Sequence, residues 1–193
     1  MNKNNTEVEL KYQIRNQKKL QGWLDKNAKL IFSSRQVDEY YTPAHENYFK
    51  EKRPRKYLRI RKSGDRWSTA FKYWYPSGKK GEYSHCDEFE TDVDNGIQLR
   101  KIYLAVGFKL LVIVDKTRTA YRYREFEIEI DKVRGLGGVC EIEIKGKYRS
   151  PEEALKRIKE FAQGIGFIET DRGDDLKLGY AYLIAKRKGI VKK

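Results

Sequence analysis

Charged and apolar residues alternate in several short segments of this 193-residue chain. The clearest are Glu7–Lys11 (EVELK), Glu127–Asp131 (EIEID) and Glu141–Lys145 (EIEIK). Successive side chains of a β-strand point to opposite faces of the sheet, so each segment predicts a strand with one apolar and one charged face. Cations occupy alternate positions in two further segments, Leu58–Arg61 (LRIR) and Lys116–Arg118 (KTR). A fold for this chain must therefore accommodate a charged face that many strands share.

Composition narrows the class of protein. The formal net charge of +14 predicts attraction to polyanions, whether nucleotides, polyphosphate, nucleic acid or an anionic membrane. No apolar run approaches the roughly 18 residues of a transmembrane helix, and no secretory signal opens the chain, so we expect no membrane association. Cys86 and Cys140 are too few for a disulfide framework, which predicts a reduced, cytoplasmic protein. Since His45 and His85 are the only histidines, we expect surface positions for both and no structural zinc site.

The length fits a single domain, 1–193, with a core at about 6–185 and a basic C-terminal tail. Alternation and turn residues predict strands at about 6–14, 29–42 (one or two short strands), 56–62, 67–75, 83–92, 108–115, 117–131 and 138–146. Helical periodicity and capping residues predict helices at about 16–28, 94–106, 151–164 and 174–187.

Two of these helices have specific start signals. Ser150, followed by Pro151, Glu152 and Glu153, forms a capping box with proline at the first helical position. Asp94 is the predicted cap of the helix at 94–106. The residues of this helix that we expect to face inward are Leu99, Ile102, Tyr103 and Val106.

Strands joined by hairpins dominate, so the predicted fold class is α+β with a mainly antiparallel sheet. A charged strand face that pointed outward would be an ordinary solvated surface. The helices, however, need an apolar sheet face to pack on, and this requirement turns the charged face inward, into the lumen of a barrel. The residues expected on the apolar face are Val8, Leu10, Leu58, Ile60, Phe89, Phe126, Ile128, Ile130, Ile142 and Ile144.

An inward face of this kind suits a triphosphate and its metal ions. A triphosphate carries about four negative charges and is held best by several Arg and Lys donors from different directions. Mg²⁺ and Mn²⁺ prefer oxygen ligands. The cations with suitable type and parity are Arg59, Arg61, Lys72, Lys116 and Arg118, and the carboxylates are Glu7, Glu9, Asp131, Glu141 and Glu143.

The motifs also resemble, in order, those of the CYTH or triphosphate tunnel metalloenzyme superfamily. The resemblance spans about residues 6–185. The chain is most similar to the class IV adenylyl cyclase branch, whose pattern DxVxGLG…ExE matches the segment from Asp131 to Glu143. The matching motifs are Glu7-x-Glu9-x-Lys11, Leu58-Arg59-Ile60-Arg61, Phe71-Lys72, Lys116-Thr117-Arg118, and Asp131–Gly137 followed by Glu141-Ile142-Glu143.

The resemblance implies a closed eight-stranded antiparallel β-barrel that forms a tunnel, with helices packed outside. It implies Mg²⁺ or Mn²⁺ as cofactor, ATP or another triphosphate as substrate, and a homodimer. Metal-ligand roles transfer to Glu7, Glu9, Glu141, Glu143 and Asp131, and phosphate contacts to Lys11, Arg59, Arg61, Lys72, Lys116 and Arg118. The candidate catalytic residues are Lys11, Lys72 and Asp131, and no general base is assigned.

One strand departs from the family pattern. It reads Cys86-Asp87-Glu88-Phe89-Glu90, where an arginine is expected two residues before the first glutamate. Glu88 and Glu90 remain candidate lumen residues. They are also candidate surface partners of Arg59 and Arg61, if those arginines are not phosphate contacts.

Other simple structural interpretations stay open. Lys72 precedes three aromatic residues. If it is not a phosphate contact, its side chain only covers an aromatic strand. Glu127 and Glu129 share the parity of Asp131, but a position beyond the tunnel mouth stays open for both, so neither is assigned as a ligand.

Three functions remain open. In a cyclase, the ribose 3′-hydroxyl of ATP attacks the α-phosphorus and pyrophosphate leaves; the DxVxGLG segment favours this reaction. In a triphosphatase, water attacks the terminal phosphorus of tripolyphosphate, thiamine triphosphate or a nucleoside triphosphate. The third function is a non-catalytic module that binds polyphosphate or RNA, which the net charge supports and the carboxylates oppose.

Overall fold

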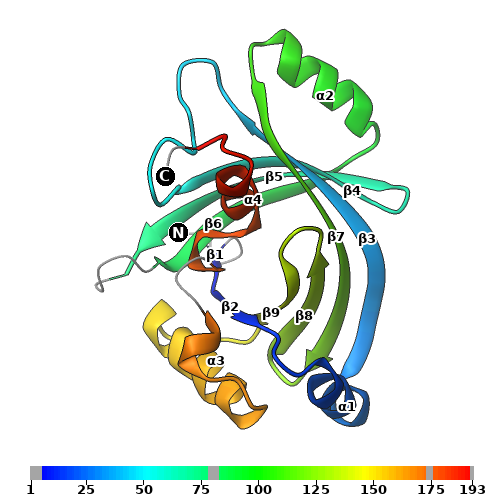
Figure 1. The fold of residues 1–193 in the computed structure, drawn as a ribbon, viewed down its shortest axis with the longest axis vertical. Coiled ribbons are helices and arrows are strands. Elements are labelled where there is room, and N and C mark those ends of the chain that lie inside the picture. Colours follow the sequence, from blue (N-terminus) through cyan, green and yellow to red (C-terminus); the bar gives the residue numbers. More distant parts are fainter. Residues whose placement is uncertain (1–5, 78–82, 173–175, 192–193) are drawn as a thin grey trace.

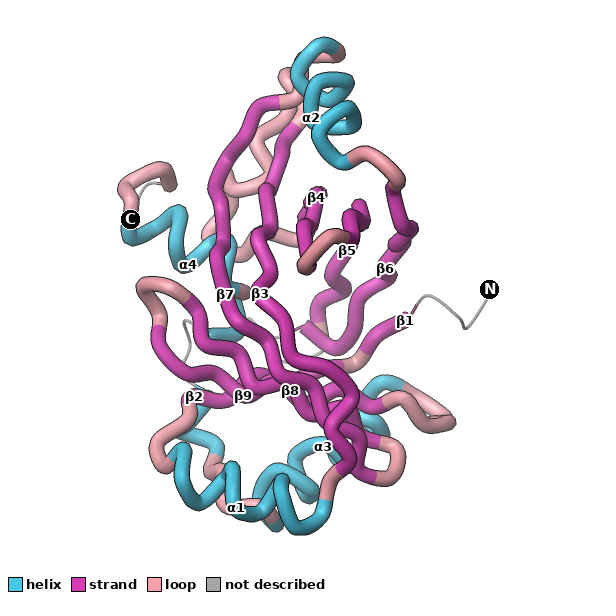
Figure 2. Tube along the Cα trace, turned by 90° about the vertical axis from the view of Figure 1, so that its right-hand side faces the viewer, coloured by secondary structure: helices cyan, strands magenta, loops and turns pink. Residues whose placement is uncertain are grey.

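The computed structural model describes residues 6–77, 83–172 and 176–191 and contains one curled antiparallel sheet (Figures 1 and 2). The strand order is β1-β6-β5-β4-β3-β7-β8-β9-β2. At the two ends of this order stand β1 (Thr6–Glu7) and β2 (Glu9–Gln13), which Val8 alone separates in the chain. The chain therefore changes partner at Val8, from β6 to β9, and so joins the two ends of the sheet into a barrel. The predicted barrel is confirmed, with nine strands because the first is interrupted.

The remaining elements follow the predicted order. The other strands are β3 (Lys29–Thr42), β4 (Lys56–Ser63), β5 (Arg66–Pro76), β6 (Tyr83–Val93), β7 (Lys109–Tyr123), β8 (Phe126–Val133) and β9 (Gly137–Ile144). The helices are α1 (Gln17–Asn27), α2 (Gly96–Ala105), α3 (Pro151–Gly164) and α4 (Tyr180–Arg187), with short 3₁₀ turns η2 (Glu169–Arg172) and η3 (Leu176–Leu178). Parts of the predicted turn at 76–78, the predicted start of the last helix at 174 and the last two residues of the tail lie outside the described residues.

Several boundaries differ from the sequence prediction. Residues 29–42 form one long strand, which pairs with β7 on one side and β4 on the other. The predicted break between 115 and 117 is absent, because β7 continues to Tyr123 and the turn to β8 lies at Arg124, whose φ is 53°. The cap of α2 is Asn95, not Asp94: its side chain accepts a hydrogen bond from the backbone N–H of Gln98 at 3.0 Å. The Ser150 cap is confirmed by its bond to the N–H of Glu153.

Helices α1 and α3 cover the apolar outer face of β2, β8 and β9 (Figure 1). Leu24 of α1 and Ile158 of α3 are buried against strand residues such as Leu10, Ile128 and Ile142. This packing is the one that the alternating pattern predicts. It turns the charged side chains of the same strands into the lumen.

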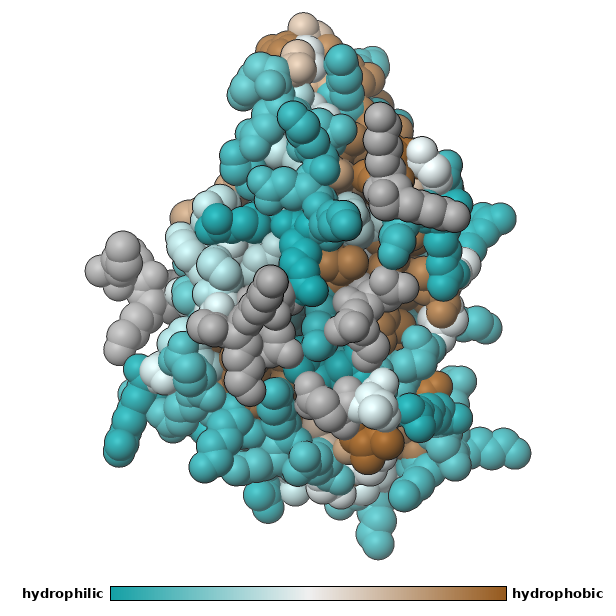
Figure 3. Space-filling model, turned by 60° about the vertical axis from the view of Figure 1, so that its left-hand side comes forward, coloured by the Kyte–Doolittle hydropathy of each residue, from teal (hydrophilic) through white to brown (hydrophobic). Residues whose placement is uncertain are grey.

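Helix α2 differs from α1 and α3 in leaving large apolar side chains exposed. Ile102 and Val106, predicted to face inward, are 55% and 66% exposed, so that prediction is wrong. The helix instead contacts the barrel through Tyr103, whose ring stacks on Phe108 and meets Tyr41 edge-on. Figure 3 shows hydrophobic side chains at the top of the molecule, where α2 lies. Phe89 on β6 was also expected under a helix and is 54% exposed.

Helix α4 occupies one end of the barrel rather than its outside. Its residues 180–185 are all buried, on every side of the helix. They pack against Val112, Val114, Val133 and Val139. These valines lie on the strand face that also carries the lumen charges, as the two-residue spacing from Val114 to Lys116 shows. The lumen is therefore closed by apolar packing at this end. None of the described helices is long and apolar enough to cross a membrane.

We expect Gly96→Ala to destabilise the protein by about 1–3 kcal/mol. A Cβ at this first residue of α2 would overlap the indole of Trp67. The matched control is Gly22→Ala in the middle of α1, where a Cβ meets no atom within 4 Å. Alanine there should leave stability unchanged or raise it by up to about 1 kcal/mol. Urea denaturation of both variants measures the difference, and equal stabilities would contradict the packing of α2 through Trp67.

Candidate functional site

The barrel encloses a cavity of about 240 Å³ with a strongly charged wall. Among the described residues, nine cationic and eight acidic side chains line it, so its charge is close to neutral. The cationic residues are Lys11, Arg59, Arg61, Lys72, Lys116, Arg118, Lys145, Arg172 and Lys177, and the acidic ones are Glu7, Glu9, Glu88, Glu90, Glu127, Glu129, Glu141 and Glu143. All six predicted phosphate contacts and four of the five predicted metal ligands are thus brought together. The fifth, Asp131, is fully buried and does not line the cavity.

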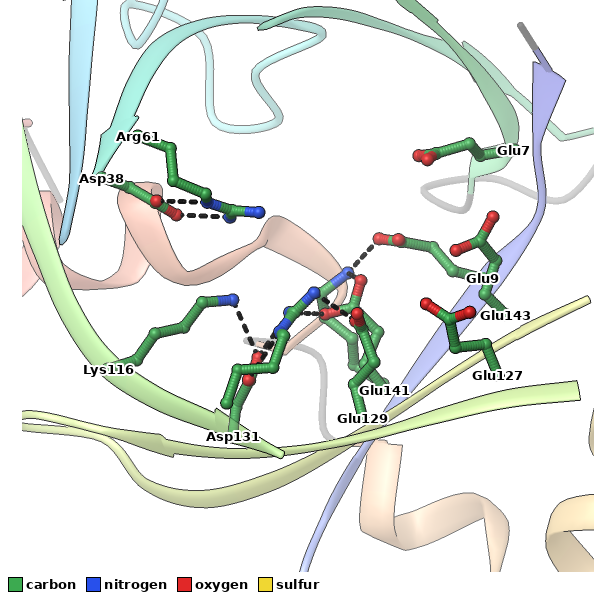
Figure 4. Close-up of polar contacts among 12 residues, drawn as sticks. Glu7, Glu9, Asp38, Arg61, Lys116, Glu127, Glu129, Asp131, Glu141 and Glu143 are labelled. Atoms are coloured by element: carbon green, nitrogen blue, oxygen red, sulfur yellow. Dashed lines mark hydrogen bonds and ion pairs between the residues drawn. The ribbon is translucent and has the colours of Figure 1, made fainter. Parts of the chain in front are cut away.

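Strand register explains why these side chains meet. Glu143 of β9 lies opposite Glu9 of β2 on one side and Glu127 of β8 on the other. In the next inward-facing row, Glu141 lies opposite Lys11 and Glu129. Like charges directly opposite one another are unfavourable, and each carboxylate of the first row is paired with a cation: Glu9 with Lys11, Glu143 with Lys145 and Glu127 with Arg122. Figure 4 shows these carboxylates converging on the lumen from β2, β8 and β9.

Lysines neutralise the carboxylates of the first strand. Lys11 pairs with Glu9 and lies 3.3 Å from Glu141. Lys72, on β5 and two strands from β1, lies 2.5 Å from Glu7 and 3.1 Å from Glu88. The ExExK segment is therefore bound to the β5–β6 part of the wall through Lys72, which excludes the interpretation of Lys72 as a mere cover of its aromatic strand.

Arg118 is the centre of a second network. Its guanidinium donates two hydrogen bonds to Asp131, at 2.8 and 2.6 Å, and a third to Glu141 at 3.0 Å. It also pairs with Glu129. Lys116 donates to Asp131 at 3.0 Å. Asp131 thus holds two lumen cations in position. Figure 4 shows Lys116 directed at Asp131.

Sequence reasoning missed one carboxylate of this site and left two others unassigned. Asp38 on β3 is buried and receives a bidentate pair of hydrogen bonds from Arg61, at 2.6 and 2.7 Å. Glu127 and Glu129, whose positions the sequence leaves open, both line the cavity. Asp38 lies directly opposite Arg61 in the pairing of β3 with β4. Its role can be recognised only when this register is known, and the sequence alone does not supply it.

Glu88 and Glu90 on β6 were candidates both for the lumen and for ion pairs with arginine. Arg59 lies 3.1 Å from Glu88 and 3.3 Å from Glu90, and all three line the cavity. Cross-strand pairing and a lumen position are thus both present. His45 is exposed and His85 stacks on Tyr75, and neither lines the cavity.

Burial and crowding shift the proton affinities of the lumen groups. Burial, reinforced by Glu88 and opposed by Lys72, raises the pKa of Glu7 to about 8. Burial and the neighbouring Glu141 raise the pKa of Glu9 to about 7, against Lys11. Burial and the neighbouring Arg118 lower the pKa of Lys116 to about 8. In each case burial disfavours the charged form of the side chain.

The lumen carboxylates fit a divalent cation by donor type. Within the described residues no three acidic, histidine or cysteine side chains already surround one point, and Lys11 stands between Glu9 and Glu141. The fit rests on Glu9 and Glu143, which lie opposite one another on β2 and β9, and on Glu141 in the next inward-facing row, because carboxylates supply the oxygen ligands that hard cations prefer. A cation there would also relieve the repulsion between them.

The charged barrel agrees with a comparison to known families, in which the sequence profile of the CYTH domain matches residues 5–173. This chain belongs to the CYTH family. Its barrel is thus a CYTH tunnel, and proteins of this triphosphate tunnel family use divalent metals and bind triphosphates.

Relatives of this CYTH chain include a Methanocaldococcus jannaschii protein named "Putative adenylate cyclase". It is 31% identical over 78 residues, which are 38% of this chain. The matched part spans 45% of that relative, less than half of its length.

Two solved structures share the fold. PH1012 from Pyrococcus horikoshii OT3 superposes with a TM-score of 0.72 at 23% identity, covering 87% of this chain and 94% of the other. A Hippeastrum protein superposes with a TM-score of 0.58 at 20% identity, covering 83% and 88%. At these identities, the likeness establishes the CYTH fold alone.

We expect Asp38→Asn to lower the free energy of unfolding by about 3–5 kcal/mol at pH 7, because buried Arg61 loses its carboxylate. Burial raises the pKa of Asp38, but Arg61 outweighs it and holds that pKa below its usual range. The stabilisation is therefore present above the unfolded-state pKa of about 3.9 and is lost as pH falls below it.

Urea titrations of wild type and Asp38→Asn at pH 7 and at about pH 3 measure this prediction, and the gap between them should shrink in acid. Asp65→Asn, in the exposed turn between β4 and β5, is the control and should change little at either pH. A gap for Asp38→Asn that does not depend on pH would contradict the ion-pair assignment.

Proposed function

We propose that this CYTH chain is a divalent-metal-dependent enzyme that acts on the triphosphate group of its substrate. The supporting observation is the cavity wall, where six cations at the motif positions alternate with carboxylates around one enclosed space. Cations alone would bind product as tightly as substrate. Interleaved carboxylates keep the lumen near neutrality, so charge can move during reaction.

In this proposal the internal ion pairs are exchanged when substrate enters. Lys11, Lys72 and Arg59 turn from Glu9, Glu7 and Glu88 toward phosphate oxygens. Arg118 and Lys116 keep their contact with Asp131, which holds them in position. Asp131 then acts as a positioning residue, while Lys11 and Lys72 are the candidates to touch the reacting phosphate.

The proposed cofactor is Mg²⁺ or Mn²⁺, held by oxygens of Glu7, Glu9, Glu141 and Glu143. When bound, such a cation neutralises phosphate oxygens and activates the attacking oxygen. The carboxylates released from their lysines are the groups free to hold it.

The reaction that we propose is hydrolysis of the terminal phosphate. Water attacks the terminal phosphorus, the bridging P–O bond breaks, and a diphosphate, orthophosphate and a proton leave. The segment that favoured a cyclase has a structural explanation here: Gly135 and Gly137 have φ values of 85° and 95° in the turn from β8 to β9. Leu136 packs beside α4 at the closed end of the lumen.

Cyclisation of ATP to cyclic AMP and pyrophosphate is the second candidate. The M. jannaschii relative carries a cyclase name, and the Hippeastrum neighbour is described as a "putative adenylyl cyclase" with "a dominant triphosphatase activity". The same cavity serves both reactions, because they differ in the attacked phosphorus. We also propose a cytoplasmic location, which agrees with two buried free cysteines, Cys86 and Cys140.

Phosphorus NMR of the products from ATP with Mg²⁺ or Mn²⁺ decides between the reactions. ADP and orthophosphate are expected, whereas cyclic AMP and pyrophosphate would establish the cyclase. If neither ATP nor tripolyphosphate is turned over, and RNA binding weakens steeply as salt rises, the chain is a binding module and not an enzyme.

We expect Glu9→Gln and Glu141→Gln each to lower metal-dependent turnover by about 100-fold, because each replaces a charged carboxylate ligand with a neutral amide. Glu160→Gln, on the exposed surface of α3, is the control and should turn over substrate like wild type. Initial rates across a Mg²⁺ titration measure the effect. Full metal-dependent activity in both lumen variants would rule out their role as ligands.

A further inference from the structure

One part of the cavity wall is aromatic or apolar and carries no cation to pair with phosphate. Trp74, Tyr83, Tyr57 and Leu178 all line the same cavity as the nine cations. The hydroxyls of Tyr57 and Tyr83 donate to backbone carbonyls, of Leu178 at 2.8 Å and of Arg53 at 2.7 Å, so they are not aimed at a ligand. Inorganic tripolyphosphate has only charged oxygens, which ring faces cannot bind. This apolar section therefore fits a different part of a substrate.

Trp74 lies directly beside predicted phosphate contacts. It follows Lys72 by two residues on β5, so both side chains point into the lumen. The ammonium of Lys11 lies 5.9 Å from the Trp74 ring centroid. A group joined to a phosphate at Lys11 or Lys72 would thus reach the indole face without leaving the cavity.

The indole is held in place by its surroundings. Trp74 and Arg55 exchange two hydrogen bonds through the Trp74 backbone, at 2.8 and 3.0 Å. The ring packs against Tyr83 with centroids 5.8 Å apart. A rigid aromatic surface on a strand is a ready platform for stacking, because little conformational entropy is lost when a ring binds to it.

We propose that Trp74 stacks on the heterocyclic ring of an organic triphosphate, such as a nucleoside triphosphate, and that inorganic tripolyphosphate is therefore a poor substrate. This inference rests on the proposed function, since it places the triphosphate among the lumen cations. The alternative role for Trp74 is purely structural: packing against Tyr83 and a cation–π contact with Lys11. A structural role would affect all triphosphates alike.

The test compares ATP with inorganic tripolyphosphate, both with Mg²⁺, in wild type, Trp74→Leu and Trp74→Phe. We expect wild type to prefer ATP. Trp74→Leu should lower kcat/KM for ATP about tenfold, the effect of removing one base–aromatic stack, and change kcat/KM for tripolyphosphate less than about twofold. Trp74→Phe keeps a ring and should retain most of the activity on ATP. Trp67→Phe, whose ring packs on α2, is the control.

An equal loss on both substrates, or no loss on either, would overturn the inference and leave the proposed function intact. Failure of wild type to turn over either substrate would instead overturn the proposed function. A fluorescence titration tests stacking without turnover, in a Trp23→Phe, Trp67→Phe variant whose remaining tryptophan is Trp74. ATP with Mg²⁺ should quench that emission and tripolyphosphate should not; identical responses would contradict stacking.

Discussion

The neutralisation of buried charge inside the barrel is the interaction on which this structure depends. Removing a charged group from water costs several kcal/mol even after relaxation, and an ion pair recovers that cost only with good geometry. The lumen meets this condition by pairing across strands, as between Lys72 and Glu7 or Arg61 and Asp38. Buried pairs of this kind add little stability compared with apolar packing. Their presence where apolar side chains would stabilise the barrel at least as well therefore argues for a binding role.

The barrel separates its stability from its chemistry. Apolar packing lies outside, under α1 and α3, and at one end, around α4. The charged rows lie between, on strand faces that this packing leaves pointing inward. The interruption at Val8 contributes as well, since Glu7 and Glu9 are carried by strand pieces that pair with opposite ends of the sheet. The two carboxylates thus line the same cavity, although β1 pairs with β6 and β2 pairs with β9.

Much of this arrangement is predictable from sequence because strand parity is a local property. The lumen positions of Glu7, Lys72 and Arg118 follow from alternation alone, and the Ser150 cap follows from its neighbours. Asp38 was missed and Glu129 was left unassigned, since their roles depend on register, a long-range property. The exposure of Ile102 and the burial of α4 on all sides also depend on long-range packing. Helical periodicity identifies an apolar stripe, but it does not say which surface covers that stripe.

The most direct test of metal-assisted ion-pair exchange is calorimetric titration of the protein with a non-hydrolysable ATP analogue, with Mg²⁺ and with EDTA. If carboxylates released from Lys11 and Lys72 take up a cation, binding should be at least about tenfold tighter with Mg²⁺, a difference of about 1.4 kcal/mol. Equal affinity in EDTA, falling steeply with salt, would contradict that claim and leave a lumen that binds phosphate by its cations alone.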